Sequence, residues 1–174
     1  MSEPFNPGVN AAIIPLASRP PLTGSTINVT GWGANSQLNT AKLPLFLQQA
    51  TNLVLLSQVE CFDRWGSYDT ITERMICAFS SSQSTCNGDS GGPAVQNGVL
   101  VGVVSWGSSW CLHPTHPNVY ANVSNLREWI LSVSFNSTNN NNNNNGSNGI
   151  GGGIMIQMMF LIIFCTIFDY SIFI

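Results

Sequence analysis

The chain has 174 residues, 7% of them charged, and a formal net charge of −3 at pH 7. This length suits one ordinary domain with extra segments and excludes two full domains. Because the chain holds five Lys and Arg residues in all, it cannot build a basic stripe along a phosphate backbone, and we expect no nucleic-acid partner.

Composition divides the chain into three segments. Residues 1–135 carry short apolar runs of strand length, such as Gly98–Trp106, separated by Pro, Gly and Asn, and this pattern predicts an all-β domain. Residues 136–153 are mostly Asn, Ser and Gly with almost nothing to bury, so we expect a solvated linker. Residues 154–174 form a hydrophobic tail with few polar side chains.

One helix is predicted within the first segment, from Ser124 to Val133. The Ser124 hydroxyl is the expected acceptor for free amide groups of its first turn. Its apolar residues recur at spacings of three and four and therefore share one face. They are Leu126, Trp129, Ile130 and Val133.

The cysteines and glycosylation motifs indicate an oxidising, secretory compartment. Reduced core thiols and chance motifs in an Asn-rich chain are the alternative interpretation. No signal peptide is predicted at residues 1–6, which are neither basic nor followed by an apolar core, and this conflicts with secretion. The cysteines are Cys61, Cys77, Cys86 and Cys111, with Cys165 in the tail, and the Asn-X-Ser/Thr motifs begin at Asn28, Asn122, Asn136 and Asn145.

The stretch TCNGDSGGPAV, residues 85–95, surrounds one serine with an acid and several glycines. A serine hydroxyl is a weak nucleophile, and acyl transfer also needs N–H donors for the negative oxygen that develops on the attacked carbonyl. The amides of Gly88 and Ser90 can point into one concavity, and the two following glycines let the backbone turn without a Cβ clash. Asp89 is then expected to point into the protein, where it needs a cation. Taken alone, the same string also fits a tight turn without chemistry.

Together with its surroundings, this stretch resembles the carboxyl-terminal half of the chymotrypsin-like serine protease family. The resemblance covers roughly residues 5–134. Its motifs are the Ser90 stretch itself, the later segments Val101–Gly107, Pro117–Tyr120 and Trp129–Ile130, and the earlier segments Val29–Gly33, Leu47–Ala50 and Met75–Ala78.

The fold predicted on this basis is the second antiparallel six-stranded β-barrel of the chymotrypsin-like fold. We expect the barrel from about Gly24 to Asn122, closed by the helix at residues 124–133. Residues 1–23 should run across the place of a partner barrel, and their apolar side chains should be exposed. These side chains include Ile13, Ile14 and Leu16.

The resemblance also implies roles for individual residues. Ser90 takes the place of the nucleophile, and the amides of Gly88 and Ser90 form the oxyanion hole. Asp89 matches the aspartate that pairs with the α-ammonium group freed by zymogen cleavage. The implied disulfides are Cys61–Cys77 and Cys86–Cys111.

The same matching places a specificity pocket. Ser84 lies at its base, Ser105, Trp106 and Gly107 form one wall, and Asn118 lies at the back. Because no carboxylate reaches the base, a Lys or Arg side chain would enter without a counter-charge, at a cost of several kcal/mol. We therefore expect a preference for apolar side chains, with Asn118 shortening the pocket.

The family's catalytic His and Asp precede the segments matched here. We therefore expect the chain to be an inactive fragment of a longer serine endopeptidase, with protein or peptide substrates and possible protease inhibitors as partners. A noncatalytic, membrane-tethered binding module is the alternative. His113 and His116 are expected to be solvated loop residues rather than a general base or a metal pair, and we expect neither a metal ion nor a cofactor.

The hydrophobic tail at residues 154–174 leaves three interpretations open. It has the length of a spanning helix, and it also fits the signal for a lipid anchor, with small residues at Gly146–Gly149. The third interpretation is a reading frame that runs on into untranslated DNA. The expected location is extracellular, either secreted or anchored at the cell surface.

Overall fold

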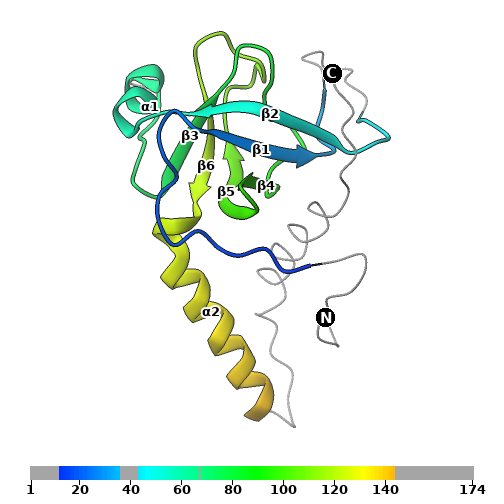
Figure 1. Cartoon of the computed structure of the whole chain (residues 1–174), viewed down its shortest axis with the longest axis vertical. Helices are drawn as coiled ribbons and strands as arrows, with labels where there is room; N and C mark the ends of the chain where they lie inside the picture. The colour runs from blue at the N-terminus through cyan, green and yellow to red at the C-terminus, as the bar shows by residue number, and fades with distance from the viewer. Residues whose placement is uncertain (1–11, 36–42, 67, 144–174) are drawn as a thin grey trace.

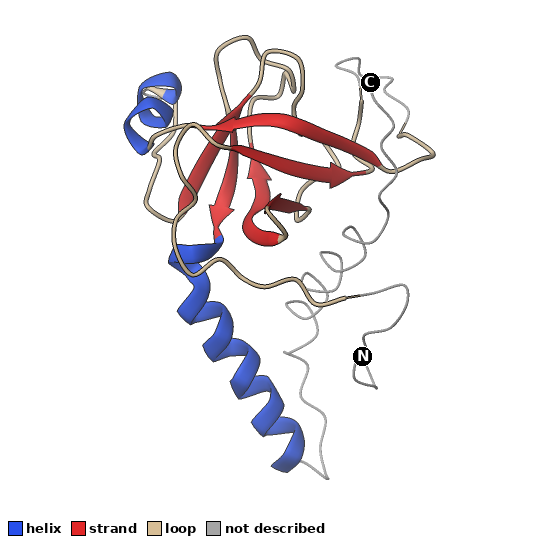
Figure 2. Ribbon diagram, viewed as in Figure 1, coloured by secondary structure: helices blue, strands red, loops and turns tan. Residues whose placement is uncertain are grey.

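The structure is a computed structural model that describes residues 12–35, 43–66 and 68–143, with residues 134–143 described as backbone only. Within these residues, six antiparallel strands close into a barrel in the order β1-β2-β3-β6-β5-β4, and α2 leads away from it (Figures 1 and 2). The predicted fold is confirmed. The elements are β1 (Thr26–Gly31), β2 (Gln48–Leu55), α1 (Gln58–Trp65), β3 (Met75–Phe79), β4 (Pro93–Gln96), β5 (Val99–Trp106), β6 (Asn118–Asn122) and α2 (Val123–Asn143).

The barrel interior is filled by apolar side chains that alternate along the strands. In β1, Ile27 and Val29 are buried, whereas Thr26 and Asn28 face outward, as the twofold side-chain period of a strand requires. Strand β1 pairs with both β2 and β4, and this double pairing closes the sheet. Tyr120, on β6, is the largest fully buried side chain of the core.

A two-residue turn joins β4 to β5. Asn97 and Gly98 both have positive φ, at 50° and 75°. A type I′ hairpin turn needs left-handed backbone at both central positions, and Asn-Gly is the pair that adopts it at least cost.

The segment before β1 covers part of the barrel. Ile13 is 74% exposed, as predicted, but Ile14 and Leu16 pack partly buried against the core, which corrects the expectation for them. The backbone explains the difference: Ala17 N–H donates to Leu100 O at 3.0 Å, and Leu100 N–H donates to Pro15 O at 2.9 Å. This short parallel bridge to β5 holds the segment, blue in Figure 1, against the sheet.

Helix α1 was not predicted, although its sequence carries a recognisable signal. Ser57 and Glu60 form the S-x-x-E pattern of a capping box, and the Ser57 hydroxyl accepts the Glu60 N–H at 3.1 Å. Cys61 and Trp65, four residues apart, are the buried residues of the helix. Gly66, with φ of 55°, ends it.

Helix α2 begins and ends differently from the prediction. Its cap is Asn122, whose Oδ1 accepts the Ser124 hydroxyl at 2.8 Å and the Asn125 N–H at 3.4 Å, so Ser124 is not the capping residue. The helix continues past Val133 to Asn143, into the predicted linker, because it meets no Pro or Gly and each added residue adds a backbone hydrogen bond. On its predicted apolar face, Ile130 packs against the core but Trp129 is 49% exposed.

The predicted tail, residues 154–174 with Cys165, lies outside the described residues. In the part of the chain that is described, no helix has both the length and the apolar character needed to cross a membrane.

Candidate functional site

The loop between β3 and β4 presents the Ser90 hydroxyl at the surface. Gly88 and Gly91 have φ of 101° and 83°, the left-handed region that favours glycine. The three amides nearest to Gly88 and Ser90 on this turn donate to backbone carbonyls: Asp89 N–H to Cys86 O, Gly91 N–H to Val104 O and Gly92 N–H to Asp89 O.

The N–H groups of Gly88 and Ser90 differ from those three amides. Neither donates to an acceptor within the described ranges, and both residues are exposed. Two unpaired amides beside an exposed hydroxyl are the donors that a developing oxyanion requires.

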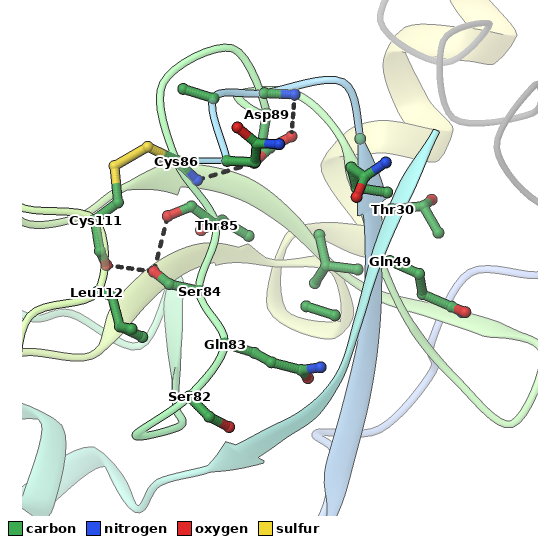
Figure 3. Close-up of a pocket in the computed structure, with 17 residues that line it drawn as sticks. Thr30, Gln49, Ser82, Gln83, Ser84, Thr85, Cys86, Asp89, Cys111 and Leu112 are labelled. Atoms are coloured by element: carbon green, nitrogen blue, oxygen red, sulfur yellow. Dashed lines mark hydrogen bonds between the residues drawn. A yellow bond between two sulfur atoms is a disulfide. The ribbon is translucent and has the colours of Figure 1, made fainter. Parts of the chain in front are cut away.

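The Asp89 side chain turns away from this surface toward the end of β1. Its Oδ1 accepts the Gly33 N–H at 2.8 Å and its Oδ2 accepts the Cys86 N–H at 2.9 Å (Figure 3). The carboxylate fits because two residues lack a Cβ: one added to Gly31 would lie 2.0 Å from Asp89 Oδ1, and one added to Gly33 would lie 2.4 Å from Asp89 Cγ. In place of the expected cation, two backbone amides hold the charge, and neither salt bridge found among the described residues involves Asp89.

A cavity of about 250 Å³ lies beside the Asp89 carboxylate. Figure 3 shows Ser82–Cys86 along one side and Thr30 and Gln49, from β1 and β2, on the other. Gln83 ties the two sides together, because its Oε1 accepts the N–H groups of Thr51 and Asn52, both at 2.9 Å. Of the residues predicted for the specificity pocket, Ser84 alone is among those lining this cavity, so the cavity is a separate space.

Three of the predicted pocket residues come together at its base. Asn118 is buried, and its Oδ1 lies 2.9 Å from the Ser84 hydroxyl and accepts the Thr85 N–H at 3.3 Å. Its Nδ2 donates to Thr85 O at 3.3 Å and lies 2.8 Å from where a Cβ on Gly107 would be. The Asn118 carboxamide therefore spans the space between the base and the wall. The structure leaves Ser105 exposed and Trp106 half-buried.

Both predicted disulfides are confirmed. Cys61–Cys77 joins α1 to β3, and Cys86–Cys111 joins the Ser90 loop to the segment that follows β5. The Ser84 hydroxyl also contacts the Cys111 carbonyl oxygen, as Figure 3 shows. The base of the predicted pocket and the Ser90 loop are thus held to one another covalently and through hydrogen bonds.

The contacts found for the two histidines are with their own loop and with neighbouring aromatic rings. Their rings stack on each other with centroids 4.1 Å apart, and no hydrogen bond between either ring and Ser90 is found in the described part of the chain. Nδ1 of His113 accepts the backbone N–H groups of Thr115 and His116, at 3.2 and 3.0 Å. Because its lone pair accepts these two N–H groups, Nδ1 is not available to bind a metal ion.

The glycosylation motifs fall in different environments. Asn28 is exposed on β1, whereas Asn122 is buried and donates its Nδ2 to Glu73 O at 3.0 Å. A glycan must attach at that nitrogen, so Asn122 in the folded chain is not accessible for glycosylation. Asn136 lies in the backbone-only part of α2, and Asn145 lies outside the described residues.

Comparisons with known proteins agree with this geometry. A family profile described as Trypsin matches residues 1–130. The chain is 44% identical over 120 residues to trypsin delta of Drosophila melanogaster, covering 68% of this chain and 46% of that protein. It is 40% identical over 136 residues to trypsin iota of the same species, covering 77% and 52%.

A solved structure is similar as well. It is described as neuropsin, a serine protease expressed in the limbic system of mouse brain, and it aligns with a TM-score of 0.64 and 35% identity over 70% of this chain and 53% of that one. The chain therefore spans about half the length of the relatives that it matches.

Proposed function

This chain belongs to the trypsin family of serine proteases, and on that premise we propose that the protein is a serine endopeptidase that hydrolyses peptide bonds through an acyl-enzyme on Ser90. The single observation that carries the proposal is the exposed Ser90 hydroxyl beside the unpaired amides of Gly88 and Ser90. One such donor contributes about 2.7 to 4 kcal/mol to stabilising the transition state in a serine protease.

The proton of Ser90 needs a base, and among the described residues no base is found hydrogen-bonded to Ser90. His113 and His116 are engaged in ring stacking and loop closure. We therefore propose that an amino-terminal barrel supplies the general base and its orienting acid, and that the 174-residue chain has no significant peptidase turnover by itself.

Asp89 and the cavity beside it support a role in activation. The carboxylate already accepts two amides, and it borders a cavity of about 250 Å³ that is lined partly by Val29, Ala50 and Leu112. An apolar space ending at a carboxylate suits a chain terminus that carries an α-ammonium group and an apolar side chain. We propose that the activated protein inserts its new terminus here, which adds an ion pair to the two hydrogen bonds.

The predicted specificity pocket favours small apolar side chains. Its base carries the Ser84 hydroxyl where a basic substrate would need a carboxylate. The polar atoms of Asn118 bond to Ser84 and Thr85, so an apolar substrate side chain leaves them satisfied. The position of the carboxamide between Ser84 and Gly107 shortens the space, which supports preference for the smaller apolar residues.

The two disulfides support an extracellular location, because such bonds persist in oxidising compartments. Protein or peptide chains are the proposed substrates, and protease inhibitors that occupy the same pocket are proposed partners. Modification at Asn28 and anchoring through residues 154–174 remain proposals.

The test uses a parent protein that joins an amino-terminal barrel to this chain. The wild-type parent is expected to cleave peptides after small apolar residues and to take one organophosphonate label per molecule, whereas Ser90→Ala should lose both activities. A dominant Lys or Arg preference would contradict the pocket assignment. A folded wild-type parent with neither turnover nor labelling would favour the noncatalytic binding module.

A further inference from the structure

Five aromatic rings form a continuous column beside the predicted specificity pocket. Neighbouring ring centroids lie 4.7, 4.6, 4.1 and 5.8 Å apart along it. Its first ring ends β5 in the predicted pocket wall, and its last three belong to the loop at residues 107–117. In order, the members of this aromatic column are Trp106, Trp65, His116, His113 and Trp110.

His113 closes the loop through a single ring nitrogen. Its Nδ1 accepts the N–H of His116 at 3.0 Å and that of Thr115 at 3.2 Å. A nitrogen that accepts N–H groups must keep its lone pair, so a proton on Nδ1 is incompatible with both hydrogen bonds. A proton added to Nδ1 would leave both amides without an acceptor in the described part of the chain.

The neighbouring ring also opposes added charge. His116 stacks on His113 with an interplanar angle of 16°, and on Trp65 with one of 10°. Two imidazolium rings at this separation repel each other. Desolvation by the surrounding rings, and then the charge of His113, lower the pKa of His116 below its ordinary value.

In the part of the chain that the structure describes, the charged side chain found in contact with this loop from another element is a cation. From α1, Arg64 donates to Thr115 O at 3.4 Å, so a cation lies against the loop backbone. The carboxylate of Glu60 is bound to that same guanidinium at 2.7 Å. Tyr68 contributes the edge of its ring to His116.

We propose that His113 is a positioning residue for substrate binding, which holds the wall of the specificity pocket in place only while its imidazole is neutral. Neutral His113 keeps residues 112–116 closed, and the column transmits that arrangement to Trp106. A proton on Nδ1 would remove the acceptor of both amides, so the closed loop is stabilised as pH rises and lost as pH falls. The consequence for substrate rests on the proposed function, but the loop transition is a property of this chain alone.

The transition is measured on the full 174-residue chain by indole ¹H–¹⁵N NMR between pH 8 and pH 4.5. The indole signals of Trp65, Trp106 and Trp110 are expected to shift together and reversibly as the pH falls across this range. Trp32 and Trp129 lie outside the column and serve as internal controls. Column signals that move no more than these two would overturn the proposal.

Two substitutions of His113 distinguish the effect of its hydrogen bonds from the effect of its ring. His113→Asn places an amide oxygen near the position of Nδ1 and does not titrate, so the column should keep its pH 8 signals down to pH 4.5. His113→Ala has no acceptor and should show displaced column signals already at pH 8. Circular dichroism shows whether the alanine variant folds. If it does not, the comparison of the wild type with His113→Asn is sufficient. A transition that persists in His113→Asn refutes the role of His113.

A substitution of His116, which stacks on His113, tests whether charge repulsion between the two rings contributes to the transition. His116→Phe keeps a ring against Trp65 and removes one titrating group, so the transition should move to higher pH. An unchanged midpoint would show that the two imidazoles do not interact.

Coupling to the substrate is measured in the active parent as KM against pH. If one molecule in five keeps the loop closed at pH 5, KM should rise about fivefold. The His113→Asn parent should show no such rise. A loop transition without a change in KM would disprove coupling to the pocket, whereas an inactive parent with an intact loop transition would disprove only the proposed function.

Discussion

Replacing Asp89 with Ala is expected to destabilise the barrel by about 2 to 4 kcal/mol. The carboxylate accepts two backbone amides, from Gly33 at 2.8 Å and from Cys86 at 2.9 Å. Hydrogen bonds to a charged group contribute about 1.5 to 3 kcal/mol each, or roughly 3 to 6 kcal/mol for the pair. Asp89 is only half-buried, and water entering the adjacent cavity of about 250 Å³ can solvate the freed amides, which reduces the expected loss to about 2 to 4 kcal/mol.

Urea unfolding followed by circular dichroism measures this loss. With a slope of about 2 kcal/mol/M, typical of a small domain, the midpoint should fall by about 1 to 2 M without a change in slope. Asp63→Ala is the matched control, because Asp63 is exposed on α1 and no hydrogen bond of its side chain is found in the described residues. Its stability should stay within about 0.5 kcal/mol of the wild type.

A substitution of Gly33 tests the same contact between Gly33 and Asp89. Gly33→Ala places a Cβ about where the Asp89 carboxylate lies, 2.4 Å from Cγ, and should cost as much as Asp89→Ala. Because both changes break the same contact, the double variant should lose less than the sum of the two. The reasoning is refuted if Asp89→Ala matches the Asp63→Ala control, or if the two losses add.

Three further outcomes are expected. In the active parent, Asn118→Gly should enlarge the pocket and move the preference from small to large apolar side chains by about tenfold in kcat/KM, and an unchanged peptide-library profile would contradict the role of Asn118 as a size filter. Joint replacement of Cys61 and Cys77 by Ala opens a bridge with a sequence separation of 16 and should cost about 3 kcal/mol in urea unfolding, so a loss below about 1 kcal/mol would show that the bridge contributes little. Ser57→Ala should cost about 1 kcal/mol through loss of the α1 cap, whereas Ser57→Asp should retain the cap, and equal melting temperatures for both variants would argue against it.

Local patterns accounted for the strands and for the backbone of the Ser90 loop. Alternation of apolar and polar residues in β1 depends only on the twofold period of a strand, and it agrees with the side chains that face inward in the structure. The glycines at 88 and 91 occupy left-handed backbone, which their lack of a Cβ already favoured. The capping box at Ser57 was equally local, and α1 could have been predicted from it.

Where two local signals competed, packing decided between them. Both Asn122 and Ser124 are good caps, and the side chain of Asn122 took that role because β6 runs directly into the helix. The Asn122 side chain is buried there, and Asn122 is therefore not a candidate for glycosylation in the folded chain. Ile14 and Leu16 looked exposed in isolation, but β5 had free backbone groups to pair with their segment.

By itself, the sequence determined the β class of the described barrel, the family resemblance and the choice of Ser90 as the candidate nucleophile, because these depend on residue types and spacings within short stretches. Only the tertiary structure decided which groups hold Asp89, how Asn118 lies across the predicted pocket and how the aromatic column forms. Gly33 is 56 positions from Asp89, and Ser84 is 34 from Asn118. Contacts over such separations arise from the register in which the barrel closes, and no local preference of either partner specifies that register.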